Sequence, residues 1–133
     1  MYQPSLFEQV SLDPTNRVKS AMREALKECR LSREQVVDEI NRLAGVEGIK
    51  TKVSLSLLDK WVAASANHLI PWKLLPIFCQ VTKSILPLQA LVAPLGLQVI
   101  GPSEIKILEW GKVELQRRAL SKKTRRLMEE IKV

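Results

Sequence analysis

The sequence predicts an all-α protein, with a compact domain of about five helices followed by a long C-terminal helix. Apolar residues recur at the i, i+3, i+4 and i+7 spacing of a single helix face in several segments. Aromatic residues make up only 5% of the chain, while leucine, valine, isoleucine and alanine are common. Proline, glycine, serine and aspartate separate the periodic segments, as helix caps and turns do.

The 133-residue chain is long enough to bury a core without disulfides or metals. We divide it into an N-terminal arm over residues 1–12, a domain over residues 13–100 and a basic helix over residues 101–133. The arm carries apolar residues that are available to dock on the domain or on a partner, namely Tyr2, Leu6, Phe7 and Val10. No periodicity decides between these two possibilities.

The first helix is expected to start after Asp13 as N-cap, with Pro14 in its first turn, and to run to about Cys29. Its predicted buried face is Val18, Met22, Ala25, Leu26 and Cys29. Its predicted solvated face is Arg17, Lys19, Arg23, Glu24, Lys27 and Glu28.

The second helix begins with a capping-box pattern, in which Ser32 is the N-cap and Gln35 stands three residues later. Gly45 is the expected left-handed residue at its end. The predicted buried stripe is Val36, Val37, Ile40, Leu43 and Ala44. The loop VEGIKTKV that follows is longer than the turn of a compact helix-turn-helix.

Ser54 is expected to cap a third helix that ends near Ala64 to Asn67, with residues 54–65 as its main part. At 100° per residue, one half of this helix is apolar and should face the core. The inward set is Leu55, Leu57, Leu58, Trp61 and Val62, and the outward set is Ser56, Asp59, Lys60 and Ala63.

The segment WKLLPIFCQVT predicts a fourth helix with an irregular start, because Pro76 removes a hydrogen bond if it lies beyond the first turn. Its apolar residues are Trp72, Leu75, Phe78, Cys79 and Val81. Pro87 opens a short fifth helix, which Pro94 and Gly96 end. Residues 97–100 should be extended, as a short stub of strand.

After Gly101 and Pro102, Ser103 is the expected N-cap of one long helix to Ile131 that is weakened at Gly111. Lys106 in place of Glu leaves only half of a capping box. A heptad-like seam runs along this helix, interrupted by Arg117 and Thr124. The seam residues are Trp110, Val113, Leu120, Leu127 and Ile131. They either pair two copies of the chain or pack back on the domain.

Composition and motifs exclude several classes of function. No apolar run is long enough to span a membrane, and the N-terminus is not a secretory signal, so we expect a cytoplasmic protein without membrane contact. Cys29 and Cys79 lack zinc or disulfide spacing, and His68 is the one histidine. No phosphate loop, nucleophile elbow or HExxH motif is present. We expect no enzyme activity, metal, cofactor or small-molecule substrate.

The net charge of +7 and the pI near 9.7 indicate a polyanionic partner. Most of the excess lies at the C-terminal end, where residues 103–133 carry nine basic against five acidic residues. A basic tail is often only a solvated helix face, so the charge alone does not establish nucleic-acid binding.

Residues 30–97 resemble the lambda-repressor-like helix-turn-helix superfamily, and more narrowly phage regulatory proteins of the CII type. The segments that carry the resemblance are SREQVVDEINRLAG as supporting helix, SLSLLDKW as recognition helix, and LLPIFCQVT with PLQALVAPLGL as closing pair. The resemblance implies a helix-turn-helix domain that binds duplex DNA, with Trp61 packed under the closing helices. Because SLSLLDKW has few long polar side chains, we expect non-specific or shape-led binding more than direct base readout.

The candidate DNA-binding residues cluster at the start of the third helix. They are Lys50, Thr51, Lys52, Ser54, Ser56 and Lys60, which combine positive charge with a helix N-terminus that can hold a phosphate. The alternative is an ordinary basic surface loop.

Four further candidates flank this cluster. Asn67 and His68 follow the helix, where related modules often touch the DNA backbone, although a lone histidine in a polar loop is more often a helix C-cap or a plain surface group. Arg33 and Gln35 begin the supporting helix, where they could reach a phosphate and brace the recognition helix. Gln35 is at least as well explained by the capping box.

The C-terminal helix carries six cations within ten residues and no acid between them: Arg117, Arg118, Lys122, Lys123, Arg125 and Arg126. They are candidates for non-specific phosphate contacts, or else the solvated face opposite the seam. The first hypothesis for the whole chain is therefore a DNA-binding regulator of phage or mobile-element type that acts as a homo-oligomer. The alternatives are a helical protein-interaction module that oligomerises through the C-terminal helix and, more weakly, an RNA-binding module.

Overall fold

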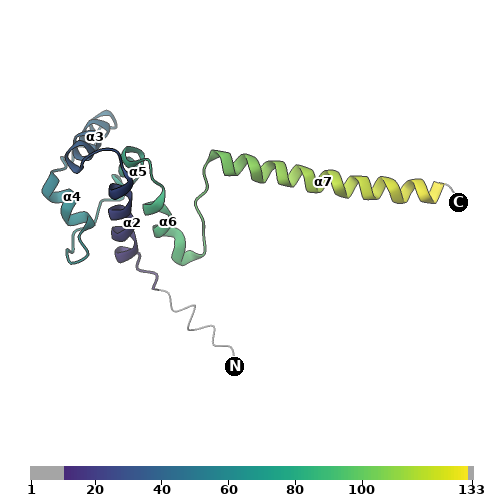
Figure 1. Ribbon diagram of the computed structural model, residues 1–133, viewed down its shortest axis with the longest axis horizontal. Helices are drawn as coiled ribbons and strands as arrows, with labels where there is room; N and C mark the ends of the chain where they lie inside the picture. Colours follow the sequence, from purple (N-terminus) through teal and green to yellow (C-terminus); the bar gives the residue numbers. More distant parts are fainter. Residues whose placement is uncertain (1–10, 132–133) are drawn as a thin grey trace, which may run out of the picture. The chain divides into compact units, whose positions relative to one another are not determined.

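A computed structural model describes residues 11–131, and all regular secondary structure within this range is helical (Figure 1). The helices are α2 (Thr15–Glu28), α3 (Arg33–Val46), α4 (Leu55–Val62), α5 (Leu75–Thr82), α6 (Leu86–Val92), the 3₁₀ helix η1 (Ala93–Leu95) and α7 (Pro102–Ile131). The predicted fold class, a helical domain followed by a long C-terminal helix, is confirmed. Most of the predicted arm, residues 1–10, lies outside the described range.

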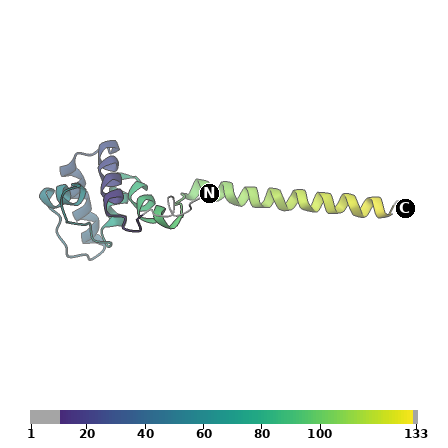
Figure 2. The ribbon, with the colours of Figure 1, turned by 90° about the horizontal axis from the view of Figure 1, so that it is seen from below.

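The chain divides into two units, Met1–Val99 and Ile100–Val133. In the first unit α2 packs against α6 and α4, and α3 packs against α4 and α5 (Figures 1 and 2). Helices α2, α3, α4 and α5 contribute apolar side chains to one core, and α6 contributes the buried Pro87. The fully buried large side chains of the core include Met22, Val36, Ile40, Leu58, Trp61, Leu74 and Phe78. Trp61 is buried as the sequence predicted, but the helices that pack against α4 are α2 and α3 and not the closing pair.

The start of α2 differs by one residue from the prediction. Asp13 was expected as N-cap, but the helix begins at Thr15 and Pro14 occupies the cap position. The Asp13 carboxylate still accepts hydrogen bonds from the Thr15 N–H and hydroxyl, and these hydrogen bonds lower its pKa. The Asp13 side chain therefore caps the first turn from the residue before the N-cap. Pro14, which lies between Asp13 and the helix, has no N–H that needs a partner.

The capping box at the start of α3 is confirmed, because Ser32 and Gln35 exchange side-chain to backbone hydrogen bonds. The predicted end at Gly45 is wrong. The left-handed residue is Gly48, with φ of 73°, and the N–H groups of Gly48 and Ile49 donate to the carbonyls of Gly45 and Ala44. This is a Schellman motif, in which Ile49 adds its usual apolar contact by packing on the core.

Helix α4 is shorter than predicted, since it ends at Val62 and Ala63 is already extended. Leu58, Trp61 and Val62 are buried as expected, and Leu57 is partly buried. Leu55, which the helical pattern placed inside, is instead 38% exposed. It lies in the first turn, at the edge of the buried face, where the core ends.

The fourth helix starts later in the chain than the sequence predicted. Trp72 to Leu74 form a turn, and α5 starts at Leu75 with Pro76 in its first turn, where a missing N–H costs nothing. The irregular start that Pro76 predicted is therefore present. Trp72, predicted as part of the apolar face, is 80% exposed.

The remaining helix boundaries follow the sequence closely. Pro87 lies in the first turn of α6, and Gly96 ends η1 with φ of 73°. Residues 97–100 form no strand in the described structure. The cap of α7 is Gly101 rather than Ser103: its carbonyl accepts from the Ile105 N–H, and its own N–H donates to the Glu104 carboxylate. No helix in residues 11–131 is both long and apolar enough to cross a membrane.

Candidate nucleic-acid interface

The leading end of α4 is open to solvent. Ser54 is the N-cap, and its hydroxyl oxygen accepts from the Leu57 N–H at 3.1 Å. The first two N–H groups of the helix, those of Leu55 and Ser56, have no intrahelical partner by the geometry of any helix start. Ser54 and Ser56 are both exposed, so hydroxyl and amide donors stand together at the positive end of the helix dipole.

The loop that enters α4 is held in place by one side chain of α3. The Asn41 amide nitrogen donates to the Val53 carbonyl and its oxygen accepts from the Val53 N–H, each at 2.8 Å. Val53 itself is buried in the core. The three loop residues that precede it, Lys50, Thr51 and Lys52, are all exposed. The loop is therefore anchored at its base while its cationic side chains face solvent.

The rear end of α4 is anchored by two cations of α2. The Lys19 ammonium donates to the carbonyls of Lys60 at 3.0 Å, Trp61 at 2.9 Å and His68 at 2.6 Å. Arg23 donates to the Val62 carbonyl. These bonds satisfy carbonyls that a helix end leaves without a partner, and the charges complement the negative end of its dipole.

The prediction that Lys19 is solvated is therefore wrong. Its side chain is only 2% exposed, and burial, followed by the charge of Arg23, lowers the pKa of the amine. The hydrogen bonds to three carbonyl oxygens offset the free-energy cost of burying the ammonium. Arg23, also predicted as solvated, is half-buried. The partners of both cations lie about forty residues away in the chain, so the helical pattern of α2 contains no sign of them.

The exposed face of α4 is narrow and carries Ser56, Asp59 and Lys60. Asp59 binds Arg33 of α3 at 2.6 Å, with both side chains about half exposed. Arg33 thus braces α3 against α4, one of the two roles expected for it, and its guanidinium is engaged by a carboxylate. Gln35 is engaged by the capping box.

Asn67 and His68 lie in the loop after α4 with exposed side chains. The bond that fixes this loop uses the His68 backbone carbonyl, which accepts from Lys19, and not the imidazole ring. Neither residue caps α4, because the helix ends at Val62. Their side chains remain available at the opposite end of α4 from Ser54.

A groove of about 980 Å³ borders the entry loop and brings in two residues that the sequence did not single out. Lys50 and Thr51 line one part of it, and Trp72 and Lys73 line another. Trp72 and Lys73 are exposed beside the start of α5. An exposed indole next to cations suits contact with a nucleic-acid backbone or base. The sequence did not reveal this exposed indole, because the helical spacing predicted that Trp72 lies in the core.

The basic run of α7 is exposed throughout, and part of it is paired. Arg117 binds Glu114 at 2.6 Å and 3.1 Å, and Arg118 approaches the same carboxylate at 3.6 Å. These hydrogen bonds lower the pKa of Glu114 and raise that of Arg117. Within residues 11–131 the other four cations, Lys122, Lys123, Arg125 and Arg126, form no ion pair.

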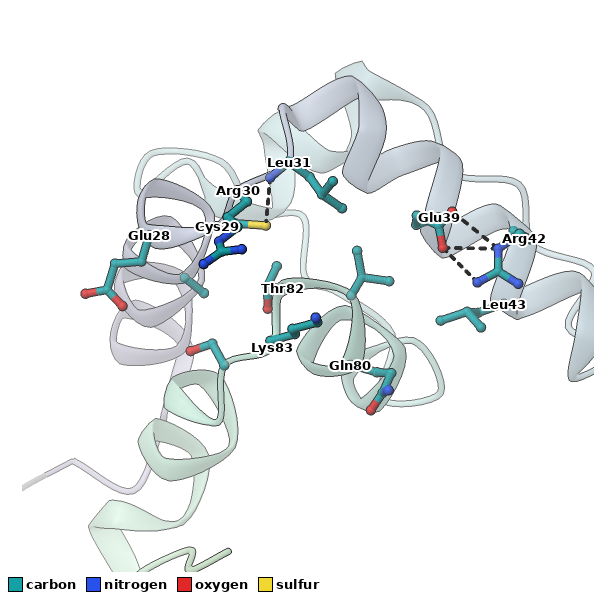
Figure 3. Close-up of a pocket in the computed structure, with 13 residues that line it drawn as sticks. Glu28, Cys29, Arg30, Leu31, Glu39, Arg42, Leu43, Gln80, Thr82 and Lys83 are labelled. Atoms are coloured by element: carbon teal, nitrogen blue, oxygen red, sulfur yellow. Dashed lines mark hydrogen bonds and ion pairs between the residues drawn. The ribbon is translucent and has the colours of Figure 1, made fainter.

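A pocket of about 800 Å³ lies where the end of α2 faces α3 and the end of α5 (Figure 3). Two of its five charged side chains, Glu39 and Arg42, bind each other, and the Cys29 sulfur accepts from the Leu31 N–H at 3.4 Å. The lining contains no histidine that could activate the thiol. In the described part of the chain, no cluster of three or more acidic, cysteine or histidine side chains is placed to hold a metal ion. We find no catalytic arrangement in this pocket.

Comparison of the chain with family models, with curated proteins and with solved structures found no match.

Proposed function

We propose that this protein binds duplex DNA through the leading end of α4 and its entry loop, without catalysing a reaction. In this proposal it is a regulator of the phage or mobile-element type that its sequence resembles. The binding surface consists of Lys50, Thr51, Lys52, Ser54 and Ser56. Lys60, Trp72 and Lys73 extend this surface on either side.

The observation that carries the proposal is the asymmetry of α4. Its rear end is buried under Lys19 and Arg23, and its inner face is buried in the core. Its leading end is exposed, and the loop before it is fixed by Asn41. A rigidly held helix with a free, donor-rich N-terminus is suited to contact phosphates or to enter a major groove.

The proposed contacts are mainly to phosphates. The exposed face of α4 offers one lysine, one serine and an aspartate that is already paired, so it has no free arginine, asparagine or glutamine for bidentate base readout. If four lysines each neutralise one phosphate, log K should fall with log salt with a slope of about −3.6. Raising the salt from about 50 to about 200 mM would then weaken binding roughly 100-fold.

The test is a fluorescence-anisotropy titration of the full chain with a labelled random duplex at these two salt concentrations. The charge reversals Lys52→Glu and Lys60→Glu together should weaken binding at low salt by at least about tenfold, because two phosphate contacts become repulsive. A matched control is the double charge reversal Arg17→Glu with Lys27→Glu, which changes two exposed cations on α2, outside the proposed surface. Equal loss in control and test variants would mean that net charge, and not this surface, binds the DNA.

The same titration separates the alternatives. Binding to duplex RNA in preference to duplex DNA would favour an RNA-binding module. No binding at low salt to either would leave the protein-interaction module, which the exposed apolar residues of α7 favour independently. The Lys122, Lys123, Arg125 and Arg126 side chains are proposed to add non-specific phosphate contacts, whose loss should lower the salt slope without changing sequence preference.

A further inference from the structure

Helix α7 has no buried residue along its 30 residues. Ten of its large apolar side chains are exposed: Ile105, Ile107, Leu108, Trp110, Val113, Leu115, Leu120, Leu127, Met128 and Ile131. So much exposed apolar surface on one helix marks an interaction site. Helix α7 is continuous from Pro102 to Ile131, through Gly111, and Figure 1 shows it as one long helix.

The apolar residues from Trp110 onward follow a heptad repeat. Trp110 and Ile131 fall at a positions, and Val113, Leu120 and Leu127 fall at d positions. The two a positions between them hold Arg117 and Thr124. A seam with a 3.5-residue period fits a second helix with the same period, and the chain itself supplies such a helix.

The charges along the seam do not distinguish the two orientations of that second helix. Residues 110–120 carry three cations against one glutamate, and residues 121–131 carry four cations against two glutamates, so each half has a net charge of +2. The helix dipoles favour an antiparallel pair, because they oppose each other in that arrangement.

The polar residue within the seam favours the same orientation as the helix dipoles. In a parallel pair each a position faces its own copy, so Arg117 would face the second Arg117 within the interface. In an antiparallel pair a positions face d positions, and the two arginines are staggered along the axis. Arg117 also remains beside Glu114, which already binds it at 2.6 Å.

We infer that α7 pairs with α7 of a second copy of this chain, as an antiparallel two-stranded coil along the seam from Trp110 to Ile131. This inference concerns assembly and does not rest on the proposed DNA binding, because its tests contain no DNA.

Sedimentation equilibrium of the full chain tests the pairing. The wild type is expected at twice its 15.1 kDa mass. Leu120→Glu places a charge in the seam and should raise the dimer Kd by at least about 100-fold. The matched control is Leu115→Glu on the same helix: the two leucines are 64% and 67% exposed, but Leu115 lies off the seam. A monomeric wild type, or equal effects of both variants, would overturn the inference.

Energy transfer between labelled copies tests the orientation. Single cysteines replace Lys106 or Glu129, which are exposed and about 35 Å apart along the helix, in a Cys29→Ser/Cys79→Ala background. Antiparallel pairing predicts efficient transfer between a copy labelled at 106 and a copy labelled at 129, and weak transfer between two copies labelled at 106. The reverse pattern would show a parallel pair and refute the inferred orientation.

Discussion

Replacing Lys19 by methionine should destabilise the N-terminal unit far more than its place on a polar-looking helix face suggests. Methionine keeps most of the aliphatic packing but removes the ammonium that holds the carbonyls of Lys60, Trp61 and His68. The substitution therefore isolates the polar anchor at the rear end of α4.

The magnitude follows from how the three acceptors are buried. The bonds to Lys60 and His68 are partly buried, so water can replace the ammonium there at small cost. The bond to Trp61 is buried, and a buried carbonyl left without a donor costs about 1–3 kcal/mol. With the smaller losses at the other two carbonyls, the free energy of unfolding should fall by about 2–3 kcal/mol. For a unit of this size the Tm would fall by roughly 10–20 °C.

Thermal unfolding followed by circular dichroism measures this effect, with chemical denaturation for the free energy. Lys27→Met is the control, because Lys27 is an exposed lysine on the same helix. Its substitution should change stability by less than about 0.5 kcal/mol. Equal stability of the Lys19→Met and Lys27→Met variants would refute the anchoring role assigned to the buried amine.

Four further substitutions probe the surroundings of α4. Gly48→Ala should cost about 1 kcal/mol in denaturant titrations because its φ is 73°, whereas Gly45→Ala, inside α3 with open space at the new Cβ, should be neutral or stabilising by up to about 1 kcal/mol. Asn41→Leu should lower stability by about 1–3 kcal/mol and speed hydrogen exchange of the Val53 amide, and an unchanged exchange rate would contradict the clamp. Asp59→Asn should tighten DNA binding severalfold in anisotropy titrations, with a stability change below about 1 kcal/mol, because it removes a surface ion pair and the one acidic group on the exposed face of α4. Weaker binding would instead show that the Asp59 carboxylate takes part in the contact with DNA.

Local signals in the sequence were sufficient to predict a helix start where the capping or first-turn residue belongs to that same helix. Ser32 with Gln35, Ser54 and Pro87 all do so, and the helices they begin were predicted close to their observed starts. The end of α3 was misplaced because two glycines lie three residues apart. Only the structure shows that Ile49, which follows Gly48, provides the apolar contact that completes the motif.

Residues whose partners lie far away in the chain could not be predicted. Lys19 and Asn41 bind backbone groups of the α4 region, and a backbone group leaves no signature in the sequence. Trp72 was assigned to the core because its spacing fits a helix, but α5 begins three residues later with a proline in its first turn. The exposed charges of the candidate site were predicted, whereas the scaffold that fixes their position was not.

Contact between duplex DNA and the leading end of α4 can be mapped residue by residue in solution. The measurement is a titration of the isotopically labelled full chain with a random duplex, followed by amide chemical shifts. The largest shifts are expected at residues 50–56, with further shifts at Trp72 and Lys73. Shifts confined to α7, or to the α2 and α6 surface, would contradict it.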